Sequence, residues 1–291
     1  SDAEDQCPAL ATNTVSQPGD LWQLGRHRLL CGDARDTNAY ARLMAGNRAA
    51  MMFTDPPYNV AIDGFAGGNG KAVRREFAMA SGEMTSVAFQ AFLQTTLGAA
   101  AATLDDGAIA FVCMDWRHMG ELVGAGAEVF DDLKNLCVWS KSNGGMGSLY
   151  RSQHELVFVF KRGRGEHHNN VELGRFGRNR TNVWSYPGVN AFGAARDAEL
   201  AMHPTVKPVA LVEDALKDVS RRGDVVIDPF GGSGTTLIAA EKCGRSARLI
   251  EIDPAYCDVT IKRYQTYTGK EAKLVDTDVT FHAAAETRHA A

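Results

Sequence analysis

The stretch VVIDPFGGSGTTLIAA at residues 225–240 joins an apolar run, a glycine-rich turn and a helical pattern. The run that ends at Asp228 is typical of a buried strand, and the glycines let the backbone turn tightly and approach a ligand. The free amide groups at the start of the following helix add a partial positive charge. This order indicates an α/β fold with a ligand bound at the carboxyl end of the strand.

Apolar runs bounded by turn residues recur along the rest of the chain. They predict strands at 28–32, 49–54, 107–114, 135–140, 155–161, 224–228 and 247–252. Helical patterns predict helices at 86–104, 208–221, 234–243 and 254–266. The alternation of these elements favours a doubly wound, mostly parallel sheet of seven strands.

Two features narrow the ligand that the glycine turn is expected to bind. No lysine follows the glycines, which disfavours a nucleoside triphosphate. Glu251 ends the next predicted strand, where its carboxylate can accept hydrogen bonds from both hydroxyl groups of a ribose. The implied ligand is an adenosine without a triphosphate.

A second unusual strand ending is FTDPPYNV at residues 53–60. Pro56 and Pro57 cannot continue a hydrogen-bonded ladder, so they hold the chain extended and stiff beyond Asp55. The Asp55 carboxylate and a free backbone carbonyl then form a rigid pair of acceptors beside the ring of Tyr58. This arrangement suits a planar ligand that carries an amino group.

TDPPYNV (54–60) and IDPFGGSGTT (227–236) together closely resemble the two signatures of the amino-methylating DNA methyltransferases, which use S-adenosylmethionine. LLCGDARD (29–36), HPTVKP (203–208) and RLIEIDPAY (248–256) resemble further segments of that family. The Asp-Pro-Pro-Tyr box precedes the glycine box, as in the circularly permuted β class. This order argues against the related small-molecule and protein-glutamine methyltransferases, which place the cofactor glycines first.

The resemblance implies methylation of adenine N6 in DNA, with the extruded base stacked on Tyr58 and held by Asp55 and the Pro56 carbonyl. Methylation of cytosine N4 stays open as an alternative, because most but not all enzymes with an Asp-Pro-Pro-Tyr box methylate adenine. Action on RNA or protein glutamine, and an inactive cofactor-binding subunit, are disfavoured. His154 and Glu155 are interpreted as structural.

The resemblance also assigns site residues. The catalytic residues are expected to be Asp55, Pro56, Pro57 and Tyr58. The cofactor S-adenosylmethionine, which leaves as S-adenosylhomocysteine, is expected to contact Asp33, Lys207, Asp228, Pro229, Phe230, Gly231, Gly232, Ser233, Gly234, Thr235, Thr236, Glu251 and Asp253.

Two segments interrupt the alternation of strands and helices. The glycine-rich segment 59–84 is expected to be a mobile active-site loop, with Arg74 and Arg75 closing over the substrate. The insert 162–203 is preceded by Lys161 and begins with an arginine-rich stretch, and it is expected to be the target-recognition element. Its expected DNA contacts are Arg175, Arg178, Arg180 and Trp184.

Composition sets the remaining bounds. The chain has 291 residues, of which 45% are hydrophobic and 23% charged, which is typical of a soluble globular protein. One methyltransferase domain is expected at 21–268, between a linker at 1–20 and a tail at 269–291.

We expect no membrane span and no metal site. We also expect a cytoplasmic protein that is encoded by a bacterium or a phage. DNA is the expected partner, although the net charge of −4 restricts its binding to local patches. A homodimer, a restriction-enzyme partner and a missing N-terminal domain are left open.

Overall fold

The computed structural model describes residues 3–59, 79–145, 147–188 and 206–290. The strands are β1 Leu21–Leu24, β2 His27–Cys31, β3 Ala49–Thr54, β4 Leu104–Met114, β5 Asp132–Ser140, β6 His154–Lys161, β7 Val183–Ser185, β8 Val225–Asp228, β9 Ser246–Glu251 and β10 Lys273–Leu274. The α-helices are α1 Thr37–Met44, α3 Ser86–Ala101, α4 Met119–Val129, α6 Val209–Val219, α7 Thr235–Cys243, α8 Pro254–Thr268 and α9 Phe281–His289. Short 3-10 helices cover Ala3–Asp5 (η1), Trp116–His118 (η2) and Glu172–Gly174 (η3).

In the described part of the chain, ten strands form one sheet in the order β10-β1-β2-β9-β8-β3-β4-β6-β5-β7. Strands β2, β9, β8, β3 and β4 run parallel, whereas β6 is antiparallel to both β4 and β5. All seven predicted strands form, so the mostly parallel, doubly wound fold is confirmed. The predicted number of strands was too low, because β1, β7 and β10 have only two to four residues each.

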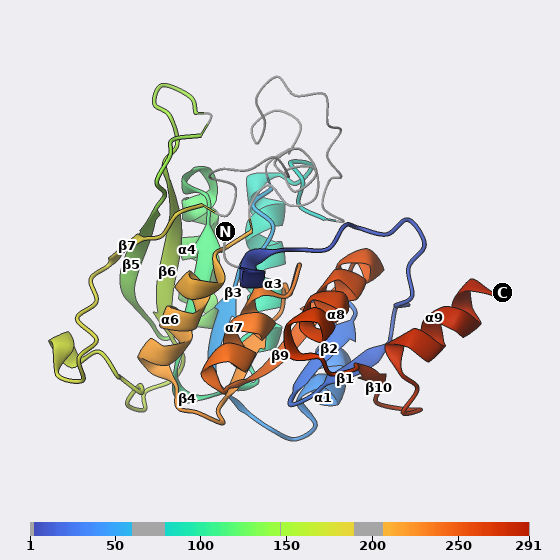
Figure 1. Cartoon of the computed structure of the whole chain (residues 1–291). Helices are drawn as coiled ribbons and strands as arrows, with labels where there is room; N and C mark the ends of the chain where they lie inside the picture. Colours follow the sequence, from blue (N-terminus) through green and yellow to red (C-terminus); the bar gives the residue numbers. More distant parts are fainter. Residues whose placement is uncertain (1–2, 60–78, 146, 189–205, 291) are drawn as a thin grey trace.

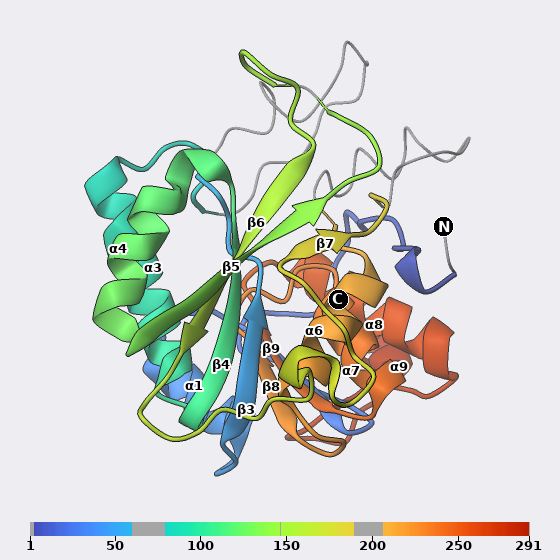
Figure 2. The same cartoon turned by 90° about the vertical axis from the view of Figure 1, so that its left-hand side faces the viewer.

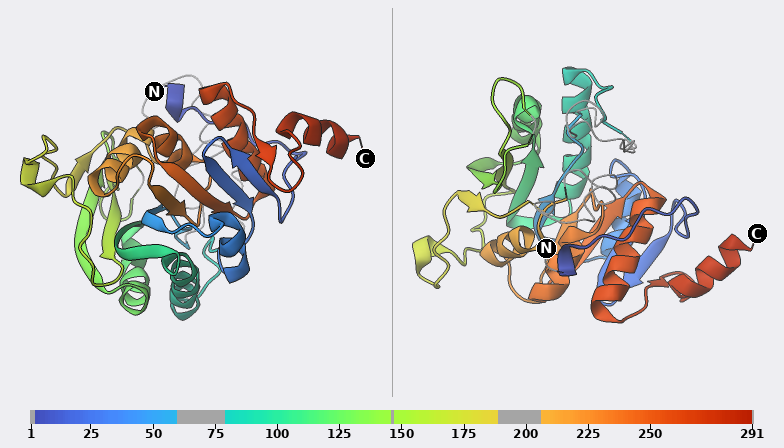
Figure 3. Two further views of the ribbon diagram at one scale, coloured as in Figure 1. Left: turned by 90° about the horizontal axis from the view of Figure 1, so that it is seen from below. Right: turned by 45° about the horizontal axis from the view of Figure 1, so that its top comes forward.

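Helices cover both faces of the sheet (Figures 1 and 2). Helices α6, α7 and α8 pack on one face, where Met51 and Phe53 of β3 join their core. Helices α1, α3 and α4 pack on the other face together with Met52. Because side chains alternate along a strand, β3 contributes to both cores. Figure 3 shows the sheet between these two helical layers from below.

Local signals explain where the predicted helices begin and end. The Thr85 side chain accepts a hydrogen bond from Ala88 at the start of α3, and Asp253 accepts one from Ala255 at the start of α8. Gly244 ends α7 in the left-handed conformation. Helix α4 was not predicted, because its three glycines weaken the helical pattern. Among the described residues, we find no helix with the length and apolar character that a membrane crossing requires.

The segments expected to be a linker and a tail are packed against the domain. The backbone amides of Val15 and Ser16 donate to the carboxylate of Asp258, at 2.7 and 2.8 Å. At the other end, β10 pairs with β1, and Phe281 of α9 packs edge-on against Trp22 at 5.5 Å between ring centroids. These contacts are long-range, and the sparse apolar residues of both segments give no periodic pattern that would predict them.

Candidate active site

Four acidic residues lie at the carboxyl ends of neighbouring parallel strands. Cys31 pairs with Glu251 in the register of β2 and β9, which places Asp33 beside the end of β9. Asp228 ends β8 and pairs with Leu249, and β3 runs beside β8 and leads directly to Asp55. The order β2-β9-β8-β3 therefore brings Asp33, Glu251, Asp228 and Asp55 to the same edge of the sheet.

Asp228 organises the turn between β8 and α7. One carboxylate oxygen accepts from the Thr54 hydroxyl at 2.8 Å and from the Phe230 amide at 3.1 Å. The other accepts from the Thr236 hydroxyl at 2.7 Å. Since Thr54 immediately precedes Asp55, this carboxylate joins the two sequence motifs directly.

The glycine turn itself is held by close backbone contacts. Gly234 has φ +84°, and a Cβ atom there would lie 2.6 Å from the Thr260 side chain, so the position requires glycine. Gly232 also has a positive φ, and its amide donates to the Glu251 carboxylate at 2.8 Å. The buried guanidinium of Arg263, which the sequence did not single out, donates to the Ser233 carbonyl and to Thr235.

Asp228 and Glu251 are carboxyl groups without a cationic partner among the described residues. Their hydrogen-bond donors are hydroxyl groups and backbone amides. Burial raises the pKa of each to about 7. A ligand that brings hydroxyl or ammonium donors would therefore stabilise the ionised carboxylates.

The other expected cofactor residues surround this turn. Asp33 lies at the end of β2, where Arg35 donates to its carboxylate at 2.6 Å and lowers its pKa. The ring of Phe230 packs near that of Phe92, at 6.0 Å. Asp253 caps α8, which gives it a structural role in this structure.

The Asp-Pro-Pro-Tyr box follows β3 directly. One oxygen of Asp55 accepts from the Tyr58 hydroxyl at 2.5 Å, and the other accepts from the Lys207 ammonium at 2.7 Å. No hydrogen bond from a described residue reaches the Pro56 carbonyl. Within the described part of the chain, that carbonyl is therefore an open acceptor next to the Asp55 carboxylate.

Lys207 lies at the centre of a cluster of charged groups, which we call the Lys207 cluster: Asp55, Tyr58, Lys141, Glu155 and Lys207. Its ammonium is 2.7 Å from Asp55, 2.6 Å from Glu155 and 3.0 Å from the Tyr58 hydroxyl. Lys141 pairs with the other oxygen of Glu155 at 2.5 Å. The Lys207 side chain is 3% exposed, so its charge depends on these carboxylates.

The two carboxylates of the Lys207 cluster differ in their affinity for a proton. Burial alone would raise the pKa of Glu155, but the ammonium groups of Lys207 and Lys141 lower it to about 2. Burial raises the pKa of Asp55, and Lys207 only partly offsets that rise. Glu155 thus stays ionised, whereas Asp55 is the carboxylate on which a proton is more readily placed.

These positions revise two interpretations of the sequence. Lys207 was expected to contact the cofactor, and the structure places its ammonium on the Asp-Pro-Pro-Tyr box. Glu155 was interpreted as structural, and it lies within hydrogen-bond distance of both Lys207 and Tyr58. The only sequence signal for Glu155 was a charged residue at the start of the predicted strand 155–161, directly before the apolar run LVFVF.

Asn59 fixes the chain at the end of the box. Its side chain accepts from the amides of Gly82 and Met84, both at 3.1 Å, and donates to the Met84 carbonyl at 2.8 Å. It has φ +54°, a conformation that Asn tolerates better than most residues. Asn59 thereby joins residues 82–84 to the box. Most of the expected mobile loop, with Arg74 and Arg75, lies outside the described residues.

The arginine-rich stretch after β6 does not lie beside Asp55. Strand β6 runs away from the site, and Asn170 donates to the carbonyls of Lys217 and Ser220 at the end of α6. Since α6 begins near Lys207, this stretch packs at the far end of the helix, and Figure 1 shows η3 on that outer edge. Residues 189–203 of the expected recognition insert lie outside the described residues.

The expected DNA contacts on this stretch have other partners. Arg178 and Arg180 both pair with Asp218 of α6, at 2.8 and 2.7 Å. Trp184 is buried, with its ring 5.8 Å from that of Phe111. These three residues contact other parts of the protein in this structure, and their contact with DNA stays a prediction. The fourth expected contact, Arg175, is exposed but lies on the same outer edge, where it pairs with Glu172.

Replacing both Arg178 and Arg180 with Ala is expected to destabilise the domain. The Asp218 side chain is 8% exposed and would lose both cationic partners, at a cost of roughly 1–3 kcal/mol. Urea denaturation measures this loss, with Arg175→Ala as the control because its exposed ion pair contributes little. Unchanged stability together with weakened DNA binding would restore the original expectation.

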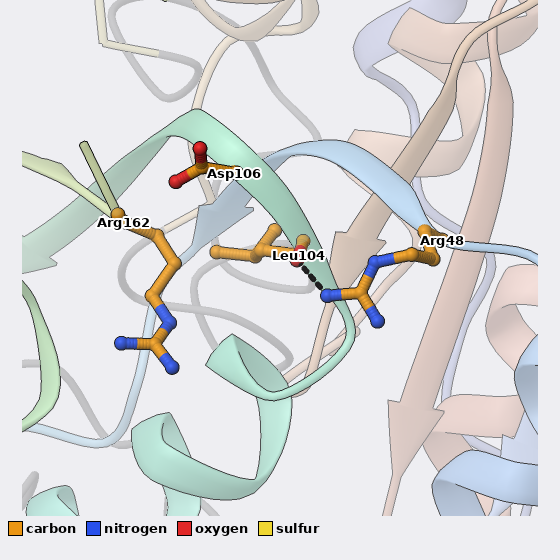
Figure 4. A pocket seen from close by; sticks show the side chains of 5 residues that line it. Arg48, Leu104, Asp106 and Arg162 are labelled. Carbon is orange, nitrogen blue, oxygen red and sulfur yellow. Dashed lines mark hydrogen bonds between the residues drawn. The ribbon is translucent and has the colours of Figure 1, made fainter. Parts of the chain in front are cut away.

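A surface cavity lies away from the site. It is lined by Arg48, Leu104, Asp106, Arg162 and Gly163 (Figure 4), which belong to the amino ends of β3 and β4 and the segment after β6. Arg48 bonds to the Leu104 carbonyl, and the Asp106 carboxylate accepts two backbone amides. We assign this cavity no part in the chemistry at Asp55. Within the described ranges, no group of three or more His, Cys, Asp or Glu side chains could hold a metal ion.

Comparison with known proteins gives matches along most of the chain. Residues 49–262 match the model of the N6_N4_Mtase family, described as DNA methylase. The type II methyltransferase M.ScaI of Streptomyces caespitosus is 38% identical over 89 residues, which cover 31% of this chain and 29% of that relative.

Two solved structures share the fold. PvuII DNA methyltransferase (cytosine-N4-specific) has a TM-score of 0.63, 14% identity and 95% coverage of both chains. TTHA0409 from Thermus thermophilus, complexed with S-adenosyl-L-methionine, has a TM-score of 0.55 and 23% identity, covering 82% of this chain and 93% of that one.

Proposed function

The chain belongs to the DNA methylase family that matches residues 49–262, and on that premise we propose that it transfers the methyl group of S-adenosylmethionine to the N6 of adenine in DNA. The observation that carries the proposal is the link between the two motifs. Thr54, next to the acceptor Asp55, donates to Asp228, which begins the glycine turn. A ligand at the turn and a base at the box would therefore meet at adjacent strand ends.

The residues around the glycine turn fit the cofactor. When bound, S-adenosylmethionine supplies an electrophilic methyl group. Glu251 offers an acceptor for the ribose hydroxyls, and Asp33 offers an acceptor for the adenine amino group. The start of α7 has no side-chain cap, so it offers a set of backbone donors. Asp228 and Glu251 also lack a cationic partner in the described chain, which favours a ligand that donates hydrogen bonds.

The box supplies acceptors for the amino group of the target base. Extruding that base from the duplex costs roughly a few kcal/mol. Both oxygens of Asp55 are occupied, by the Tyr58 hydroxyl and by Lys207. An entering amino group would replace the Tyr58 hydroxyl, which frees that ring to stack on the base. Lys207 would keep the other oxygen oriented, and the Pro56 carbonyl would accept the second amino hydrogen.

The proposal of adenine depends on the composition of the box. Asp55 supplies a charged acceptor. Within the DNA amino-methyltransferases, a box with Asp-Pro-Pro-Tyr is found mostly in enzymes that methylate adenine N6, whereas Ser-Pro-Pro is found in enzymes that methylate cytosine N4. The fold is shared with a cytosine-N4-specific enzyme and does not distinguish the two bases. The Asp-Pro-Pro-Tyr box therefore favours adenine.

Labelled methyl transfer tests the class of substrate. The protein is incubated with methyl-labelled S-adenosylmethionine and, in separate samples, plasmid DNA, RNA or a protein mixture. We expect label in DNA alone, and none with Asp55→Ala. Label in RNA or protein but not in DNA would contradict the proposal.

Lys207→Met is expected to reduce methyl transfer at neutral pH. Lys207 lowers the pKa of Asp55, so its loss raises that pKa and the acid limb of the rate profile moves to higher pH. The rate of transfer measured as a function of pH reports this shift. Lys207→Arg keeps the charge and should move the limb less, and Lys141→Met is the matched control because Lys141 pairs only with Glu155 in this cluster. A profile unchanged in Lys207→Met would exclude this role.

A further inference from the structure

The β5–β6 hairpin, described at residues 141–145 and 147–153, extends from the sheet at the end that carries the site. β5 ends at Ser140, which pairs with His154 at the start of β6, so the hairpin continues beyond the last ladder pair. Lys141 at its base pairs with Glu155, and Glu155 pairs with Lys207. Figures 1 and 2 show the hairpin standing above the strands. It is therefore attached directly to the Lys207 cluster.

The tip of this hairpin exposes two large apolar side chains. Leu149 is 85% exposed and Tyr150 is 83% exposed. Adjacent apolar side chains that are both exposed can mark a site of interaction. Residues 141–153 contain Lys141 and Arg151 and no acidic residue, in a chain whose net charge is −4. Lys141 is paired with Glu155, whereas no described carboxylate pairs with Arg151, which directly follows Tyr150. An apolar tip beside this guanidinium suits a polyanion that has stacked rings.

Hydrogen bonds brace the hairpin below its tip. The Lys141 amide donates to the Gln153 carbonyl at 2.9 Å, and the Gly145 amide to the Ser152 carbonyl at 2.7 Å. The Arg151 guanidinium donates to the Gly144 carbonyl at 2.6 Å. The tip is thus presented on a braced arm, which reduces the entropy lost when it binds.

We propose that Leu149 and Tyr150 contact the DNA duplex beside the extruded base and fill the space that the base leaves. This inference rests on the proposed function. It assigns a DNA contact to the hairpin, which lies at the same end of the sheet as Asp55, whereas the arginine-rich stretch packs at the far end of α6. Apolar side chains inserted between base steps stabilise an unstacked duplex, which lowers the cost of base extrusion.

The double variant Leu149→Ala/Tyr150→Ala tests the proposal. The variant removes the stacking of the Tyr150 ring and the apolar contact of Leu149, so duplex affinity and kcat/KM for plasmid methylation should each fall about tenfold or more. S-adenosylmethionine affinity and the Tm should not change, because both side chains are exposed. Tyr150→Phe keeps the ring and should retain most of the affinity.

Leu173→Ala/Phe176→Ala is the matched control, since these two side chains are also exposed, at 98% and 57%, but lie on the outer edge near η3. It should leave DNA affinity and methylation unchanged. Wild-type methylation of DNA with no loss in the hairpin variant would overturn the inference and leave the proposed function standing. A hairpin variant that only abolishes self-association would assign the tip to a second copy of the chain and overturn it too. Absence of DNA methylation by the wild type would instead refute the proposed function.

Discussion

Replacing Asp55 with Ala is expected to lower the rate of methyl transfer to DNA by several orders of magnitude while the protein stays folded. Asp55 is the charged acceptor at the tip of β3, and its oxygens bond to Tyr58 and Lys207. Loss of one preorganised polar group at a reacting centre costs about 100- to 1,000-fold. Here the loss also leaves the Lys207 ammonium beside the amino group that must react. The rate is measured with both substrates saturating.

Two further variants separate chemistry from structure. Asp55→Asn keeps the size of the side chain but presents an amide nitrogen to the target amino group, so it should also fail. Tyr58→Phe should retain much of the activity, because the ring is kept and its hydroxyl leaves Asp55 when the base enters. Thermal unfolding and cofactor binding confirm that each variant is folded. Robust transfer by Asp55→Ala would remove the proposed mechanism.

Asp228→Ala is expected to weaken the binding of S-adenosylmethionine by roughly a hundredfold, because it removes the hydrogen bonds to a charged group that hold the turn. The Thr54 hydroxyl, the Thr236 hydroxyl and the Phe230 amide all lose their acceptor. Calorimetry measures the affinity for S-adenosylmethionine. Glu251→Gln is a second variant of the same site, in which the side chain keeps its size but loses its charge. The hairpin variant Leu149→Ala/Tyr150→Ala serves as the folded control. Equal affinity in Asp228→Ala would refute the cofactor site.

Cofactor affinity should also increase as pH rises through about 7. Burial raises the pKa of Asp228 and Glu251 to about 7, above the ordinary value of a carboxyl group. Only the ionised carboxylates are full acceptors for ligand donors, so binding improves once both have lost their protons. The stability of the protein without ligand should change in the opposite direction. The folded protein binds these two protons more tightly than the unfolded chain does, so the free energy of unfolding falls as pH rises toward about 7. Calorimetry across this range tests both signs.

Elements whose signal is local could be predicted from the sequence. Strand β3 begins and ends where the apolar run 49–54 begins and ends, and α3, α6, α7 and α8 agree with the predicted helices to within three residues at each end. The parallel sheet predicted from these elements places Asp33, Glu251, Asp228 and Asp55 at the carboxyl ends of strands, and the observed order makes those strands neighbours. Each depends on short-range periodicity or on a turn that only glycine or proline permits.

Pairings between distant residues could not be predicted. The arginines at 178 and 180 indicated a phosphate-binding surface, but both pair with Asp214 and Asp218, which lie in another element. Lys207 and Glu155 are 52 positions apart in the printed sequence and meet only because β6 and the start of α6 reach the same end of the sheet. Charge composition shows how many cations a segment carries but not which carboxylates they face.

Nucleoside analysis of the methylated DNA tests the central claim most directly. Plasmid DNA from a strain without adenine or cytosine methylation is incubated with the protein and S-adenosylmethionine, digested to nucleosides and separated by mass. We predict N6-methyladenine, absent when Asp55→Ala replaces the wild-type protein. N4-methylcytosine in place of N6-methyladenine would contradict the assignment of the target base.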